Sequence, residues 1–160
     1  MSDLTGAFLS CADIPASGFG VIRVDCRVRG CISVVHLDLA KVVADTNWYP
    51  RSPNVRSYDH DLPFNGAADR LRSLMQLVRA EGRLPPVAVY VPGEQEFVCY
   101  PDGRHRVMLL YTAGYRSLPA LVPSRNAEAV TRLVGTTFPD ERIIVTRPRR
   151  NLSSMGWCSS

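Results

Sequence analysis

Apolar and polar residues alternate along residues 21–28 (VIRVDCRV), with the two-residue period of a half-buried β-strand. The following dipeptide, Arg29–Gly30, predicts a turn, and residues 31–40 (CISVVHLDLA) predict a second strand. We therefore expect these two segments to pair as a β-hairpin.

A helical period replaces the alternation between residues 67 and 82 (AADRLRSLMQLVRAEG), where apolar residues recur on one face. Gly82 is a suitable stop for this helix. The intervening residues 45–66 are rich in Pro, Asn, Asp and Ser. Irregular stretches of that length are typically functional or mobile loops.

Two short strands are predicted at residues 84–91 (LPPVAVYV) and 96–100 (EFVCY), with a turn at PGEQ between them. Asp102 is then expected to cap a helix that runs from Gly103 to Ala113 and ends at Gly114.

Residues 117–123 (SLPALVP) predict another strand, and Ser124 is expected to cap a last helix over residues 125–135. From Thr136 onward the chain predicts a strand or an extended arm. This order of elements indicates a small α+β domain over residues 1–145, with helices packed on a mixed sheet, followed by a basic, flexible tail at 146–160.

The composition is that of a soluble globular protein, with 46% hydrophobic and 21% charged residues, and 160 residues suit one domain. No apolar run approaches the ~20 residues that cross a bilayer, so membrane insertion is not expected. The N-terminal segment carries an acid where a secretory signal would carry basic residues. These features predict a cytoplasmic protein.

Arginine supplies nearly all the positive charge, because Lys41 is the only lysine among nineteen basic side chains and the net charge is +4. A GC-rich genome would explain the overall excess but not local clustering. The five cysteines include no C-x-x-C pair, so neither a zinc site nor a disulfide framework is predicted. Reduced, buried thiols are expected at Cys26 and Cys31.

Positive charge is also clustered in D-G-R-H-R, from Asp102 to Arg106, at the start of an apolar segment. Arginines in the first turn of a helix are unfavourable by about 0.3–1 kcal/mol each, because the helix dipole is positive there. An anion bound at the turn reverses the sign of this effect. The alternative is that the arginines extend into solvent or pair with Asp102, Glu94 or Glu96.

The strands before D-G-R-H-R, the apolar helix ending in A-G-Y and the segment S-L-P-A-L-V together resemble the core of the ParB/sulfiredoxin superfamily, from Ala67 to Val122. The run D-G-R-H-R-V-M-L-L is most similar to plasmid fertility-inhibition factors of the Osa and FiwA type. Such factors suppress conjugative or T-DNA transfer through type IV secretion systems, with ATPase and DNase activity associated with the fold. Arg104 stands where sulfiredoxins have their attacking cysteine, so sulfiredoxin chemistry is not expected. The segment Y-P-R-S-P-N-V-R is only weakly similar to the conserved motif that lies upstream of this region in ParB proteins.

The resemblance implies a set of site residues. The phosphates of ATP, another nucleotide or DNA would be contacted by Gly103, Arg104, His105 and Arg106, with the loop residues Arg51 and Arg56 facing them. Catalysis would fall to Asp102, Arg104, His105 and Arg106. Asp59 and Asp61 could hold Mg²⁺, since carboxylate oxygens suit that ion, although a solvated turn is the alternative for that loop. The tail arginines Arg147, Arg149 and Arg150 could follow a nucleic-acid backbone.

Three functions remain open at this point. The first is a nucleotide-dependent, Mg²⁺-assisted DNase. The second is a non-catalytic module that binds DNA or docks onto a secretion or coupling ATPase. The third is a ParB-like protein that binds one defined DNA sequence.

Overall fold

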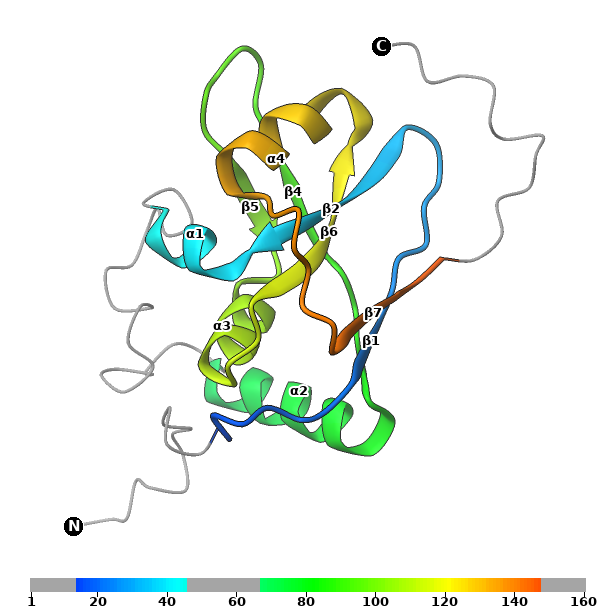
Figure 1. Ribbon diagram of the computed structural model, residues 1–160, viewed down its shortest axis with the longest axis vertical. Helices are drawn as coiled ribbons and strands as arrows, with labels where there is room; N and C mark the ends of the chain where they lie inside the picture. Colours follow the sequence, from blue (N-terminus) through cyan, green and yellow to red (C-terminus); the bar gives the residue numbers. More distant parts are fainter. Residues whose placement is uncertain (1–13, 46–66, 148–160) are drawn as a thin grey trace.

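Two small sheets organise the residues that the computed structural model describes, 14–45 and 67–147 (Figure 1). The first contains β3 (Arg83–Leu84), β1 (Ile22–Asp25) and β7 (Ile143–Thr146) in that order, with both pairings parallel. The second has the order β2 (Ile32–Asp38), β6 (Ser117–Pro123), β4 (Val87–Tyr90) and β5 (Cys99–Asp102). In this second sheet β6 is antiparallel to β2 and parallel to β4, and β5 is antiparallel to β4. The protein is an α+β domain, as the order of elements predicts.

The helices are α1 (Leu39–Ala44), α2 (Ala67–Glu81), α3 (Arg104–Thr112) and α4 (Ala127–Val134), with a 3₁₀ turn, η5 (Ser124–Asn126), before α4. Figure 1 shows α3 between α2 and the four-stranded sheet. Helix α2 buries Leu71, Met75 and Val78 at the helical spacing that its sequence predicts, and Gly82 follows it with a positive φ of 62°. None of the helices in the described part of the chain is long and apolar enough to span a membrane.

The two faces of the four-stranded sheet differ in burial. On one face the side chains are buried in the core: Val35, Leu37, Leu118, Ala120, Val122, Val87 and Val89. The neighbouring positions along each strand point to the opposite face, and there Ile32, Val34, Leu121 and Ala88 are only half-buried, while Tyr90 is exposed. The sheet therefore presents one face that is not fully covered.

The expected hairpin of residues 21–40 is wrong. Strand β1 pairs with β3 and β7, whereas β2 pairs with β6 in the other sheet. The second strand also ends at Asp38, because the Asp38 carboxylate accepts from the Ala40 amide at 3.0 Å and starts α1. The two segments have the alternation of strands, but their partners come from distant parts of the chain.

Two expected helix caps are also wrong. Asp102 is the last residue of β5, and the N-cap of α3 is Gly103. Ser124 begins η5 instead, and its hydroxyl hydrogen-bonds the Ser33 hydroxyl at 2.8 Å. Asn126 occupies the N-cap of α4 without capping it, because its side-chain oxygen accepts from the Val91 amide at 3.2 Å.

The cysteines follow the prediction only in part. Cys26 is free and fully buried, and burial raises its pKa to about 11, with Arg147 acting in the opposite direction. Cys31 is exposed and disulfide-bonded, so the prediction of a buried, reduced thiol there is wrong.

Candidate phosphate site

The first turn of α3 begins directly at the end of β5, with Gly103 as its N-cap in the left-handed conformation. The helical hydrogen bonds start with the Val107 amide, which donates to the Gly103 carbonyl at 3.0 Å. The preceding amides of residues 104–106 have no acceptor within the helix. No side chain caps this turn, and it contains no acidic residue. The amides and the positive end of the helix dipole therefore form a feature suited to an anion.

Gly103 is required by packing rather than by the approach of a ligand. Its φ is 102°, and a Cβ at this position would lie 2.2 Å from Val87 Cγ1 on β4. The glycine thus lets the helix begin against the sheet, which fixes where its first turn points.

Arg106 is held by the protein itself, and its side chain is only 11% exposed. Its guanidinium donates to the carbonyl oxygen of Pro85 at 3.1 Å and to that of Pro86. It also donates to the Asp102 carboxylate at 2.7 Å. These contacts join α3 to the segment between β3 and β4. The ion pair with Asp102 that the sequence left open as an alternative is thus present at Arg106.

Arg104 and His105 are the members of the motif that remain near solvent. Arg104 is exposed, and within the described ranges no hydrogen bond or ion pair holds its guanidinium. Burial lowers the pKa of His105, and the charges of Arg70, Arg104 and Arg106 lower it further, while Asp102 acts in the opposite direction. The lowered pKa favours the neutral imidazole, which lies within the field of several guanidinium groups.

Arg70 is a member of this cluster that sequence reasoning missed. It projects from α2, more than thirty residues before the motif, and is exposed. The available signal was its position off the apolar face of α2, but the sequence does not show that α2 packs beside α3. The described residues thus assemble two exposed arginines, Arg70 and Arg104, around His105 at an uncapped helix end.

The remaining expected site residues are not brought to this turn. Arg51, Arg56, Asp59 and Asp61 lie outside the described residues, as do Arg149 and Arg150. Arg147 follows β7. Burial lowers the pKa of His36 and the charge of Arg147 lowers it further, whereas at Cys26 that charge only opposes the rise in pKa caused by burial. Within 14–45 and 67–147, no group of three or more His, Cys, Asp or Glu side chains could hold a metal ion.

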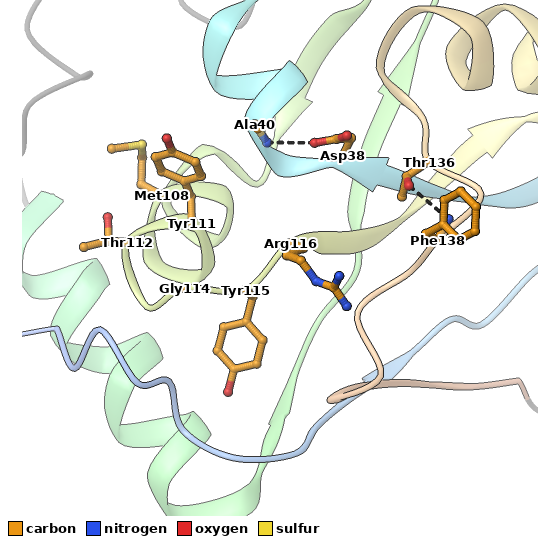
Figure 2. Close-up of a pocket in the computed structure, with 10 residues that line it drawn as sticks. All are labelled: Asp38, Ala40, Met108, Tyr111, Thr112, Gly114, Tyr115, Arg116, Thr136 and Phe138. Atoms are coloured by element: carbon orange, nitrogen blue, oxygen red, sulfur yellow. Dashed lines mark hydrogen bonds between the residues drawn. The ribbon is translucent and has the colours of Figure 1, made fainter.

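A separate hollow of about 800 Å³ lies at the other end of α3, between that end and the start of α1 (Figure 2). Tyr111 and Phe138, 43% and 80% exposed, supply apolar surface there. Its polar groups are largely engaged, since Asp38 caps α1 and the Thr136 hydroxyl accepts from the Phe138 amide at 3.0 Å. This hollow has no cluster of free charge.

Comparison with known proteins yields no match to a family model, to a curated protein or to a solved structure. The function is therefore inferred from the geometry of the site, together with the motif resemblance in the sequence.

Proposed function

We propose that the first turn of α3 binds the phosphates of a nucleotide or a nucleic acid. One observation carries this proposal: a nine-residue helix begins with no side-chain cap and no acid, beside an arginine that has no partner in the described part of the chain. A turn selected only for stability would have an acid or a capping side chain. A bound phosphate would supply the missing negative charge.

Each group at the turn has a defined role in this proposal. The amides of residues 104–106 donate to phosphate oxygens, and the planar guanidinium groups of Arg104 and Arg70 supply charge and paired donors. The lowered pKa of His105 favours its neutral form before binding. A nearby phosphate raises that pKa, so the imidazole takes up a proton on binding at mildly acidic pH.

The resemblance to plasmid fertility-inhibition factors extends the proposal to biological context. In that reading the protein acts in the bacterial cytoplasm, on ATP or on DNA, and suppresses transfer through a type IV secretion system. His105 would then serve as general base towards a water molecule. Mg²⁺ would add charge stabilisation, and its ligands would come from Asp59 and Asp61, since the Asp102 carboxylate is already bound to Arg106.

The second candidate is a binding module that performs no hydrolysis. It is favoured by the engagement of Asp102 and Arg106, two of the four expected catalytic side chains, with each other and with backbone carbonyls. Phosphate release from ATP and cleavage of labelled DNA, each measured with Mg²⁺ and with EDTA, separate the two candidates. Turnover that requires Mg²⁺ supports the enzyme, and binding without turnover supports the module.

Arg104→Ala tests the phosphate site directly, because this side chain is exposed and makes no structural contact in the described residues. We expect it to weaken ATP binding at least tenfold in titration calorimetry at low salt, without a loss of thermal stability. Arg132→Ala removes the same charge from an exposed position on α4 and serves as the matched control. Equal affinities in the wild type and both variants would contradict the proposal.

His105→Gln supplies an independent readout. Wild-type affinity for ATP is expected to rise as the pH falls from 7 to 5.5, because protonation of His105 adds a positive charge. The variant should lack this rise. A pH dependence that is unchanged in the variant would remove His105 from the site.

A further inference from the structure

The open face of the four-stranded sheet is hollowed into a groove of about 470 Å³. Its floor is apolar and comes from all four strands, with Ile32 from β2, Leu121 and Pro123 from β6, Ala88 and Tyr90 from β4, and Pro101 from β5. This volume is within the range of small-ligand pockets, about 300–1,000 Å³. The groove shares no lining residue with the first turn of α3.

Three arginines line the groove, and no acidic residue does. Arg27 and Arg29 come from the connection between β1 and β2, and Arg125 comes from η5. Arg27 lies 3.4 Å from the Asp25 carboxylate, but its side chain is 79% exposed, so this pair is weak. No hydrogen bond or ion pair within the described ranges holds Arg29 or Arg125, and both are exposed. A surface of this kind attracts a ligand with several negative charges.

Two other hollows among the described residues lack this combination. The one in Figure 2 is lined by Asp38 and Arg116, so that both signs of charge are present. Another, near the end of α1, is lined by Lys41, Asp45 and Glu96. The surplus of positive charge is therefore a property of this groove and not of every concavity on an arginine-rich protein.

Tyr90 places an aromatic ring among these charges. It is 40% exposed and stands opposite Cys99, its partner across the β4–β5 pair. The neighbouring Cys99 side chain raises the pKa of Tyr90. The ring is thus positioned on a rigid strand at a surface that solvent reaches.

We propose that this groove binds a segment of single-stranded nucleic acid, with a base stacked on Tyr90 and backbone phosphates at Arg27, Arg29 and Arg125. Aromatic residues within a positively charged groove are the general means by which proteins bind single strands. In a duplex the bases are already stacked on one another, so a flat aromatic ring on a sheet has no base face to contact. An acidic peptide would satisfy the arginines but would leave the apolar floor and the exposed ring without a complementary group.

The test uses fluorescein-labelled twelve-nucleotide oligo-dT and oligo-rU with the full chain, measured by fluorescence anisotropy. Tyr90→Ala is expected to weaken binding by about 5- to 150-fold, the range for loss of one stacked base. Tyr90→Phe retains the ring and should bind within about twofold of wild type. This second variant distinguishes stacking from any role of the tyrosine hydroxyl, and circular dichroism verifies that each variant is folded.

The arginines have a separate signature in the salt dependence. Each phosphate contact on a single strand contributes about 0.7 to the slope of log affinity against log salt concentration. The double variant Arg29→Ala, Arg125→Ala should therefore reduce that slope by about 1.4, whereas Arg132→Ala should leave it unchanged.

The proposal is overturned if the wild type does not bind either oligonucleotide, or if Tyr90→Ala and the double arginine variant bind as tightly as wild type. It is also overturned if a duplex of the same length, or poly-glutamate, competes as well as the single strand. The groove does not depend on the phosphate site of α3. Loss of ATP binding in Arg104→Ala, with oligonucleotide binding still sensitive to Tyr90→Ala, would show that the two sites are independent.

Discussion

Replacing Arg106 by alanine separates the structural part of the D-G-R-H-R motif from its exposed part. The Arg106 guanidinium binds the carbonyls of Pro85 and Pro86 and the Asp102 carboxylate, and its side chain is 11% exposed. A hydrogen bond to a charged group contributes about 1.5–3 kcal/mol. The bond to Pro85 is exposed, so water replaces it at little cost, and the Asp102 side chain is 69% exposed, so that pair contributes under ~1 kcal/mol. We therefore expect a loss of about 2–4 kcal/mol in the free energy of unfolding.

The comparison with Arg104 makes this expectation specific. Arg104→Ala removes a neighbouring arginine from the same turn, but an exposed one, and surface substitutions of this kind change stability by within about 0.5 kcal/mol. Urea denaturation followed by circular dichroism measures both variants on the same scale. Arg106→Lys should recover only part of the loss, because a compact ammonium group does not reproduce the fork that spans carbonyls and a carboxylate.

One outcome would refute the structural role of Arg106. The free energy of unfolding of Arg106→Ala could lie within ~1 kcal/mol of the wild-type value while phosphate binding is lost. In that case the side chain binds the ligand and does not stabilise the fold. The reverse pattern, a destabilised protein whose folded fraction binds phosphate normally, is the one that the contacts of Arg106 predict.

Two further predictions concern the framework. Gly103→Ala should destabilise the fold by about 2–5 kcal/mol in the same urea assay, because alanine is strained in the left-handed conformation and its Cβ would clash with Val87. A loss below ~1 kcal/mol would contradict that packing. The buried Asp140 carboxylate has its pKa lowered from 3.8 to about 2, first by its side-chain hydrogen bond with Arg142 and also by the Arg142 and Arg116 amides, against the opposing effect of burial. Asp140→Asn should therefore lower the free energy of unfolding by about 2 kcal/mol at pH 7. The difference from wild type should shrink as the pH falls from 4 to 2. A difference that stays constant over this range would show that ionisation of Asp140 does not stabilise the fold. Glu141→Gln, at the exposed next position, is the control.

The periodicity of the sequence predicts where several of the helices and strands lie. The spacing of Leu71, Met75 and Val78 predicts helix α2, because few structures other than an α-helix place residues at this spacing on one face. Strand β6 coincides with its predicted range, residues 117–123. Helix α3 also lies where it was expected, ending before Gly114, whose φ is 85°. In these segments the residues that determine where the helix or strand lies are within the segment itself or next to it.

Tertiary structure decided which partner each group meets. Residues 21–28 and 31–40 predict two strands, but β1 finds its partners at β3 and β7, far along the chain, so the sequence could not exclude a hairpin. The same holds for Arg106, whose acceptors at Pro85 and Pro86 lie about twenty residues away. The hydrophobic period of a segment indicates only which of its sides is buried. It does not identify the distant segment with which a strand pairs.

The candidate surfaces show the same division. The sequence by itself identified a cluster of arginines at the start of a helix and the chemistry that such a cluster suits. Only the folded chain showed that Arg106 is used internally, that Arg70 joins Arg104 from another helix, and that Arg27, Arg29 and Arg125 line one groove with Tyr90. A charge is local to its residue, but a binding surface is made by segments that meet only when the core has formed.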